Sequence, residues 1–232
     1  MNIKGLIFDL DGVIVFTDYF HYLAWKKIAD ELGIYFDETI NNRLRGVSRM
    51  ESLEIILERY NGAPLSDEQK KELAEKKNNI YREYLKTMTR KDVSDEVRKT
   101  LAELRRRGFL LAIGSSSKNA KFILERVELT DAFDKISDGT NIVHSKPDPE
   151  VFLKAAEYLS LAPSECAVIE DAFAGIDAAK AGNMIAVAIG DATFYDRADV
   201  KLEQFSDLLA LPFLKETHLS FGERCAKELP PE

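Results

Sequence analysis

Two aspartates, Asp9 and Asp11, lie two positions apart near the start of the sequence, directly before Gly12. They end a short apolar run, residues 3–8, whose length and following turn predict a buried parallel strand. At the carboxyl end of such a strand both carboxylates can point into the crevice where open α/β sheets bind ligands. Crowded carboxylates repel unless one is protonated, so the pair predicts a divalent cation, and hard oxygen ligands suit Mg²⁺. The alternative interpretation is a polar turn, because Asp and Gly are favoured turn residues.

Two further polar features follow later predicted elements. The segment 115–119 holds three serines and an asparagine between an apolar run and a helix, where free backbone N–H groups and the helix dipole suit an anion. Helix capping by serine is the alternative for this segment. Lys146 precedes Pro147 between two predicted elements, where a prolyl bond, a candidate for the cis form, fixes the backbone. Taken alone, this lysine is an ordinary surface charge.

A second acidic pair, Glu170 and Asp171, ends a further apolar run before Gly175 and a helix. Helix capping explains one of these acids but not both. Together the chain offers a carboxylate nucleophile, hydroxyls, a lysine and a metal-type acid pair, each after a different predicted strand. Phosphoryl transfer needs such groups, because its catalysis consists largely of positioning and of neutralising charge on the transferring oxygens.

From residue 96 onward, apolar runs alternate with helical patterns, which predicts right-handed crossovers and a parallel sheet. With the first strand included, we expect a Rossmann-like α/β core of five parallel strands. The predicted helices are 96–107, 118–127, 149–159 and 172–182, and the later predicted strands are 109–114, 135–138, 166–169 and 185–189.

Residues 17–88 form an almost unbroken helical block with no strand among its segments. Gly33 is a predicted helix stop, and Ser66 to Gln69 has the spacing of a capping box. We interpret this block as three to four helices inserted as a lid. The expected organisation is an α/β core domain over 1–15 and 92–217, a helical cap domain over 16–91 and a frayed tail over 218–232.

The composition suits a soluble enzyme of 232 residues with 45% hydrophobic and 31% charged residues. The net charge of -8 argues against a broad nucleic-acid surface. Two cysteines, no signal-peptide pattern and no apolar run near the length of a membrane helix favour a cytoplasmic protein without a membrane partner. We expect a monomer.

The set of motifs resembles the haloacid dehalogenase superfamily. Its four motifs match Asp9-Leu10-Asp11-Gly12, Ser115, Lys146 and Glu170-Asp171. The cap segments 21–26 and 44–53 are similar to those of the β-phosphoglucomutase family, as are the segments 77–78, 115–119 and 145–147. The resemblance spans most of the chain.

This resemblance implies roles for the acidic residues. Asp9 would attack phosphorus and become an aspartyl phosphate, and Asp11 would give and take the proton of the sugar hydroxyl. Mg²⁺ would be held by the Asp9 carboxylate, the Asp11 backbone carbonyl and Asp171, with Glu170 alongside.

It also implies a substrate site shared between core and cap. Ser115 and Lys146 would hold the transferring phosphoryl group, and Arg49 would grip the other phosphate of a sugar phosphate through its guanidinium fork. His21 and Lys77 would couple cap closure to the acid and base. Without the resemblance, Arg49 is a solvated helix-end charge and His21 a partly buried helical histidine. The implied substrate- and phosphate-binding residues are His21, Trp25, Gly46, Val47, Ser48, Arg49, Ser52, Lys77, Asn78, Ser115, Ser116, Ser117, Asn119 and Lys146.

The segment 15–17, the expected hinge between the core and the cap, departs from the family pattern. Family members commonly carry Thr-Asp-Thr or Thr-Asp-Ser after the nucleophile segment, whereas Val15, Phe16 and Thr17 stand here. A hydroxyl and a carboxylate are thereby missing from the hinge, which bears on its hydrogen bonds, on the tuning of Asp11 and on substrate choice.

Three functions follow from these patterns. The first is a Mg²⁺-dependent β-phosphoglucomutase that interconverts β-D-glucose 1-phosphate and glucose 6-phosphate through β-glucose 1,6-bisphosphate. The second is a sugar-phosphate phosphatase on the same fold, in which water resolves the aspartyl phosphate. The third is a binding protein without turnover, against which the intact acids and lysine argue. The cap residues favour the mutase, because transfer to a sugar requires a grip on its far phosphate and the exclusion of water.

Overall fold

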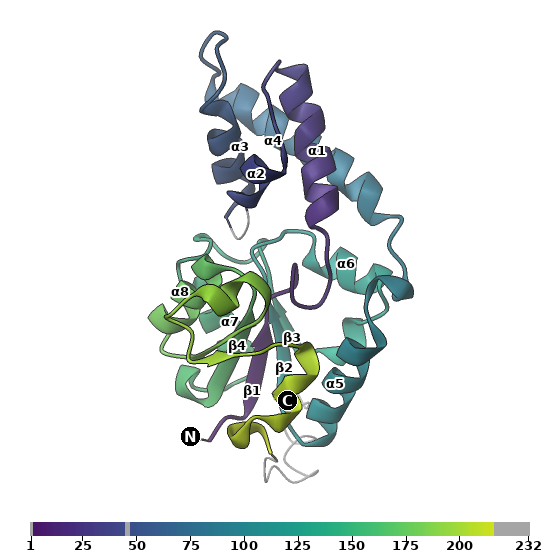
Figure 1. Cartoon of the computed structure of the whole chain (residues 1–232), viewed down its shortest axis with the longest axis vertical. Coiled ribbons are helices and arrows are strands. Elements are labelled where there is room, and N and C mark those ends of the chain that lie inside the picture. Colours follow the sequence, from purple (N-terminus) through teal and green to yellow (C-terminus); the bar gives the residue numbers. More distant parts are fainter. Residues whose placement is uncertain (1, 45–46, 216–232) are drawn as a thin grey trace, which may run out of the picture.

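The computed structural model describes residues 2–44 and 47–215 and has two parts, a parallel sheet with flanking helices and a group of helices above it (Figure 1). The strands are β1 (Gly5–Phe8), β2 (Leu110–Gly114), β3 (Lys135–Ser137), β4 (Cys166–Glu170), β5 (Ile185–Ala188) and β6 (Val200–Lys201). The helices are α1 (Asp18–Glu31), α2 (Glu38–Asn42), α3 (Arg49–Leu57), α4 (Asp67–Leu85), α5 (Asp95–Arg106), α6 (Ala120–Arg126), α7 (Glu150–Tyr158) and α8 (Phe173–Ala181).

The sheet is parallel throughout and has the strand order β3-β2-β1-β4-β5-β6. The α/β Rossmann-like prediction is therefore confirmed, but the described part of the sheet has six strands rather than the expected five. The additional strand β6 has two residues and pairs with β5 through Val187 and Val200. A strand of this length gives no readable apolar period, so the sequence did not reveal it.

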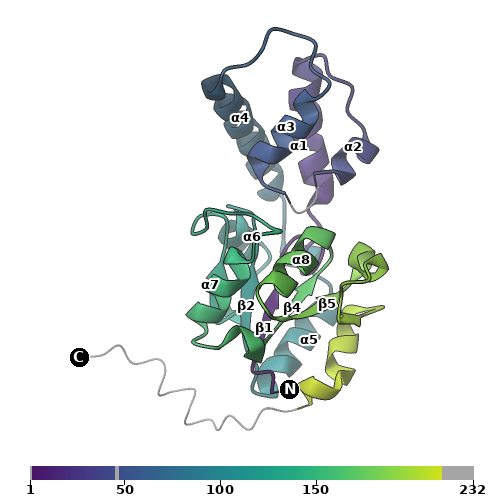
Figure 2. The same cartoon turned by 90° about the vertical axis from the view of Figure 1, so that its left-hand side faces the viewer.

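β1 lies inside the sheet, between β2 and β4, and both of its faces are covered. Leu6 and Phe8 point to one face and pack in a hydrophobic cluster with α5 and α6, whereas Ile7 points to the other face and packs with α7 and α8. Successive residues of a strand alternate between faces, so each face of β1 contributes to a separate cluster. Figure 2 shows α7 and α8 on one side of the sheet.

The helices α1 to α4, here called the helical cap, form a group beyond the carboxyl ends of the strands (Figures 1 and 2). They have their own hydrophobic cluster, in which Trp25 and Ile28 of α1 pack against Leu53 and Ile56 of α3. The predicted capping box of Ser66 and Gln69 is present at the start of α4. The domain boundaries at 15/16 and 91/92 stay our proposal.

Two further predictions concern the C-terminal tail and a membrane-spanning helix. The expected tail, 218–232, lies outside the described residues. Within the described ranges, no helix combines the length and the apolar character that crossing a membrane requires.

Candidate active site

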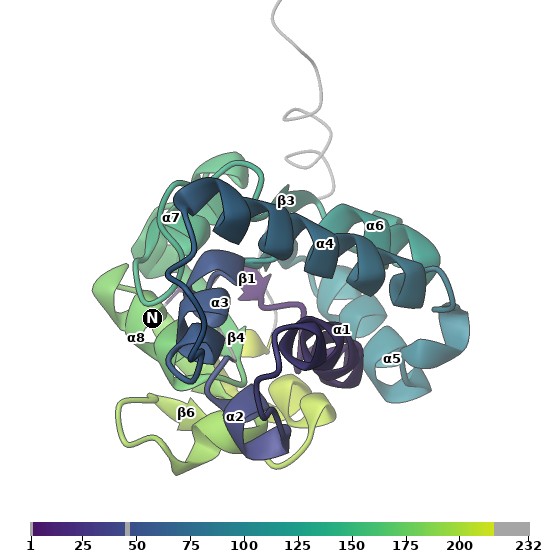
Figure 3. The ribbon, with the colours of Figure 1, turned by 90° about the horizontal axis from the view of Figure 1, so that it is seen from above.

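A cavity of about 460 Å³ lies between the carboxyl ends of the strands and the helical cap. Viewed from above, β1 ends beneath the cap helices (Figure 3). Gly46 lies outside the described residues, and every other candidate site residue lines this one cavity. These residues are Asp9, Asp11, His21, Trp25, Val47, Ser48, Arg49, Ser52, Lys77, Asn78, Ser115, Ser116, Ser117, Asn119, Lys146, Glu170 and Asp171.

Lys146 is the buried cation of the core side of the cavity. Its Nζ lies 2.5 Å from Oδ1 of Asp9 and 2.5 Å from Oε1 of Glu170. Burial alone would lower the pKa of this lysine, but the two carboxylates raise it above its usual value. The Lys146–Pro147 bond is cis, as the sequence indicated. A fixed positive charge therefore lies beside the first aspartate.

Asp11 is held by the hinge through Thr17, whose hydroxyl donates a hydrogen bond to Oδ1 of Asp11. The hydroxyl of Tyr81, on α4, donates in turn to Oγ1 of Thr17 at 3.0 Å. Burial and then the neighbouring Asp9 charge raise the pKa of Asp11 to about 7. Such a carboxyl can hold or release a proton near neutral pH, which general acid–base catalysis requires.

His21 and Lys77 form a pair on the cap side. Nζ of Lys77 lies 2.8 Å from Nδ1 of His21 and also lies over the rings of Trp25 and Tyr81, at 4.9 and 4.6 Å from their centroids. Burial, followed by the charges of Lys77 and Arg49, lowers the pKa of His21 well below its usual value. The imidazole is therefore neutral, and its Nδ1 accepts the hydrogen bond from the lysine.

Arg49 reaches the cavity from the first turn of α3. Its guanidinium donates to Oδ1 of Asn78 at 2.8 Å and lies 3.4 Å from a carboxylate oxygen of Glu75. The same Asn78 oxygen accepts a hydrogen bond from Nδ2 of Asn119 at 3.0 Å. Asn78 belongs to the cap and Asn119 to the core, so this contact joins the two sides of the cavity.

The serine loop follows β2 at the floor of the cavity. Oγ of Ser115 accepts from the N–H of Ser117, and Oγ of Ser117 accepts from the N–H of Asn119. Oγ of Ser116 is buried and has no hydrogen-bond partner, so its donor remains available to a ligand in the cavity. Ser115 itself is 2% exposed. Both bonds join residues two positions apart ahead of α6, whose N-cap Asn119 makes no side-chain cap hydrogen bond, so helix capping does not account for these serines.

The fit of a divalent cation depends on where Asp171 points. A Cβ placed on Gly12 would lie 2.1 Å from Oδ2 of Asp171, so this carboxylate presses against the turn that carries both first-motif aspartates. Both carboxylate oxygens of Glu170 already accept hydrogen bonds, from Lys146 and from the N–H of Ala172. Within the residues described, no three carboxylate, imidazole or thiolate side chains form a metal cage by themselves. A fitting ligand set would be the carboxylates of Asp9 and Asp171 together with the backbone carbonyl of Asp11. Such a set suits a hard cation that keeps several waters.

Sequence reasoning missed Tyr81 among the residues that line the cavity. Tyr81 is 1% exposed, lines the cavity and holds the hinge threonine. It follows Lys77 by four positions on one helix and therefore lies on the same face, which is the signal that would have revealed it. The hinge departure has a structural outcome: Val15 is buried, Phe16 is 76% exposed at the cavity, and Thr17 keeps its bond to Asp11.

The parallel sheet, with a cavity where its strands end beneath the cap helices, puts the chain in the Rossmann-like α/β class. The chain belongs to the haloacid dehalogenase-like hydrolases, whose family model matches residues 3–183. The resemblance found in the sequence is thereby confirmed.

Individual relatives include both mutases and phosphatases. A β-phosphoglucomutase of Bacillus subtilis is 42% identical over 207 residues, which cover 88% of this chain and 91% of that protein. A fructose-1-phosphate phosphatase of Escherichia coli is 32% identical, over 80% of this chain and 95% of that protein. The crystal structure of a β-phosphoglucomutase from Clostridium difficile superimposes with a TM-score of 0.83 at 36% identity, over 97% of this chain and 96% of that one.

Proposed function

We propose that this protein is a β-phosphoglucomutase, which interconverts β-D-glucose 1-phosphate and glucose 6-phosphate through β-glucose 1,6-bisphosphate. The observation that carries the proposal is that one cavity is lined both by Asp9 and Lys146 from the strand ends and by Arg49 and Lys77 from the cap. A substrate with two phosphate positions needs anion-binding groups at both ends of its site. The mutase relatives from Bacillus subtilis and Clostridium difficile support the same function.

In this proposal Asp9 is the nucleophile. One of its oxygens forms a bond to phosphorus while the bond to the sugar oxygen breaks, and the phosphoryl group ends on the aspartate. The Lys146 ammonium lies beside Asp9 and balances charge on the transferring oxygens. Asp9 and Asp171 would hold Mg²⁺, which would supply further positive charge to the transferring group.

Asp11 moves the proton. Protonated, it donates to the departing sugar oxygen; ionised, it accepts the proton of the hydroxyl that takes the phosphoryl group back from Asp9. A pKa of about 7 lets both forms occur at neutral pH. The hydroxyl of Thr17 keeps the carboxylate on the hinge side of the cavity.

Arg49 binds the phosphate that does not react. Its guanidinium, partly buried and hydrogen-bonded by Asn78, offers a fork to phosphate oxygens. Transfer of the phosphoryl group from Asp9 to the free hydroxyl of the sugar monophosphate gives the bisphosphate. The bisphosphate then turns round, so that Arg49 holds the phosphate just transferred and Asp9 attacks the other one. Closure of the cap over the cavity excludes water, which would otherwise hydrolyse the aspartyl phosphate.

The second candidate is a sugar-phosphate phosphatase, which the Escherichia coli phosphatase relative supports. One assay decides between them. The protein is incubated with β-glucose 1-phosphate, Mg²⁺ and a trace of the bisphosphate, and glucose 6-phosphate and free phosphate are both quantified. The mutase produces mainly glucose 6-phosphate; mainly free phosphate would replace our proposal by the phosphatase.

A further inference from the structure

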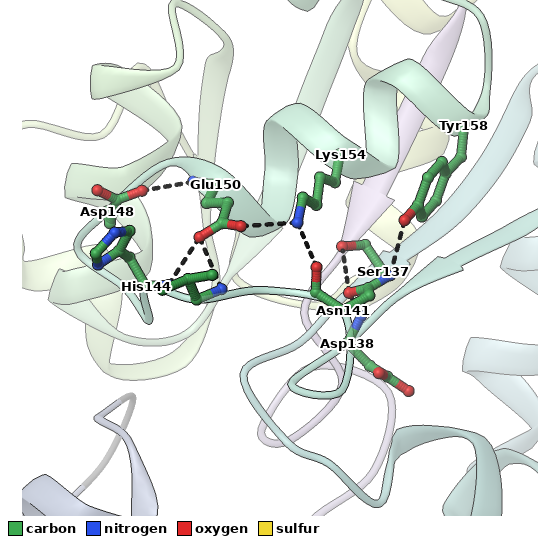
Figure 4. Close-up of polar contacts among 9 residues, drawn as sticks. Ser137, Asp138, Asn141, His144, Asp148, Glu150, Lys154 and Tyr158 are labelled. Atoms are coloured by element: carbon green, nitrogen blue, oxygen red, sulfur yellow. Dashed lines mark hydrogen bonds and ion pairs between the residues drawn. The ribbon is translucent and has the colours of Figure 1, made fainter.

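A ladder of polar side chains on α7 holds the loop that leads to Lys146. Glu150, Lys154 and Tyr158 are spaced four residues apart and therefore lie on one face of this helix. All three make hydrogen bonds to the segment 141–144, as Figure 4 shows. The ladder lies outside the cavity, and neither the sequence motifs nor the proposed reaction accounts for it.

Glu150 accepts hydrogen bonds from two consecutive backbone N–H groups of this loop. Its Oε2 accepts hydrogen bonds from the N–H of Val143 at 2.9 Å and from the N–H of His144 at 2.7 Å (Figure 4). Hydrogen bonds from backbone N–H groups to a carboxylate are charge-assisted and stronger than neutral ones. Two neighbouring peptide groups are thus held by a single side chain, two positions before Lys146.

Lys154 and Tyr158 bind the part of the loop that lies nearer to β3. Nζ of Lys154 lies 2.7 Å from Oε1 of Glu150 and donates to the backbone carbonyl of Asn141. The side-chain amide of Asn141 donates to the hydroxyl of Tyr158 at 3.1 Å, and its oxygen accepts from the N–H of Asp138 at 3.0 Å. The connection from β3 to α7 is therefore tied to the helix at several points along its length.

The helix also contacts Lys146 directly. Nζ of Lys146 lies 4.7 Å from the ring centroid of Phe152, which is buried against the sheet. Phe152 faces the ammonium, while Glu150 faces the backbone just before the same lysine. α7 therefore constrains both ends of the lysine, the main-chain end through the loop and the ammonium end through the aromatic ring.

We propose that Glu150 is a positioning residue for Lys146: by fixing the backbone at Val143 and His144, it sets the point from which the ammonium reaches the transferring phosphoryl group. The proposal rests on the phosphoryl-binding role proposed above for Lys146. It assigns to α7 a function in the reaction although Glu150 itself touches no substrate.

The charge of Glu150 supports this arrangement. The hydrogen bond from Lys154, followed by that from the His144 N–H, lowers the pKa of Glu150 to about 2. The carboxylate is therefore ionised throughout the pH range in which such a protein works, and its hold on the loop does not depend on pH.

The test measures the affinity of the whole chain for inorganic phosphate by calorimetry in the presence of Mg²⁺, so that no turnover is needed. Glu150→Ala is expected to weaken phosphate binding about tenfold, because the ammonium no longer sits at its binding position. Glu150→Gln keeps an oxygen that can accept from both N–H groups and is expected to stay within about threefold of the natural protein. Glu157→Ala, an exposed glutamate on the same helix, is the matched control and leaves affinity unchanged.

A double-mutant cycle separates positioning from general stability. In a Lys146→Ala background, Glu150→Ala is expected to change phosphate affinity less than twofold, because there is no ammonium left to position. An equal loss in both backgrounds, or an unchanged affinity of Glu150→Ala alone, would overturn the proposal. If Glu150→Ala does not fold, the cycle is run with Glu150→Asp, whose shorter carboxylate releases at least one N–H, and the same two outcomes apply.

The cycle is independent of the mutase assignment. Should the product assay yield mainly free phosphate, the proposed function fails while the coupling between Glu150 and Lys146 can still be measured. Conversely, additive effects of the two substitutions would exclude the positioning role of Glu150, whereas the outcome of the mutase assay would not change.

Discussion

Nζ of Lys146 lies 2.5 Å from Oδ1 of Asp9, and both side chains are almost completely buried. A buried cation costs free energy unless it is paired, so this contact favours the charged form of Lys146. The two carboxylates around Lys146 raise its pKa, and the lysine is therefore an ammonium at any working pH. The first aspartate thus faces a permanent positive charge, as an attack on an anionic ester requires.

The first prediction concerns the nucleophile. Asp9→Asn keeps the shape of the side chain but replaces the attacking carboxylate, so kcat should fall by a factor of at least about 10³ for sugar phosphates and aryl phosphates alike. Mass spectrometry of the rapidly quenched natural protein should show one added phosphoryl group, which the variant lacks. Asp30→Asn, on the exposed side of α1, is the control and should retain activity. Activity of Asp9→Asn within tenfold of the natural protein would exclude the role.

The second prediction concerns the stability of the protein as a function of pH. The pKa of Asp11 is about 7 in the folded protein, against 3.8 for an unperturbed aspartate. Between these values the folded state binds one proton more than the unfolded state, so the free energy of unfolding falls as the pH rises and becomes level above about pH 7. Asp11→Asn has no such proton. Relative to this variant, the natural protein should lose at least about 1 kcal/mol between about pH 4 and pH 7.

Urea unfolding of the two proteins at several pH values measures this difference, because titrating groups away from Asp11 contribute equally to both curves. Parallel curves would mean that the folded protein does not hold Asp11 protonated, and the proposed acid role would lose its basis. A third protein, Thr17→Val, removes the hydroxyl that lowers the pKa of Asp11, so the level region should begin at higher pH.

The third prediction concerns the far phosphate. Arg49→Ala should lower kcat/KM for a hexose phosphate by about 10²-fold, since a charge-assisted bidentate contact to phosphate is lost. For p-nitrophenyl phosphate, which has neither sugar hydroxyls nor a second phosphate position, the loss should stay within about threefold. Arg43→Ala removes an exposed cap arginine that pairs with Glu58 and is the matched control. Equal losses for both substrates would show that Arg49 stabilises the cap and does not bind the far phosphate of the sugar phosphate.

Local patterns in the sequence were enough to predict the core and most of the residues around the cavity. The aspartates, the serines and the acid pair each follow an apolar run, and parallel strands bring all such ends to one edge of the sheet. Lys146 lies in the connection from β3 to α7. The roles of these residues stay predictions. Contacts between distant segments could not be predicted, because no periodicity encodes them. Asn78 of the cap meets Asn119 of the core only once the two parts are assembled. Glu150 and Val143 are nearer in sequence, but their bond forms only when the loop folds back against α7.

The last prediction compares two glycines that share a backbone conformation. Gly12 and Gly33 have φ values of +91° and +68°, a region that L-residues enter only with strain of about 1–2 kcal/mol. Around Gly33, at the end of α1, nothing lies within 4 Å of an added Cβ, whereas at Gly12 the added atom would lie 2.1 Å from the Asp171 carboxylate. Gly33→Ala should therefore lower stability by about 1–2 kcal/mol and leave kcat unchanged.

Gly12→Ala adds a second effect to the same strain, because Asp171 must move away from the turn that carries Asp9 and Asp11. The Mg²⁺ concentration for half-maximal activity should rise at least about tenfold in this variant only, and titration calorimetry with Mg²⁺ in the absence of substrate should show the same shift. Stability measured by urea unfolding should fall in both variants. If Mg²⁺ dependence is unchanged in Gly12→Ala, the close approach of Asp171 to the turn has no part in binding the cation, and the ion must be held elsewhere. Because both variants carry a side chain at positive φ, the difference between them reports mainly on the position of the Asp171 carboxylate.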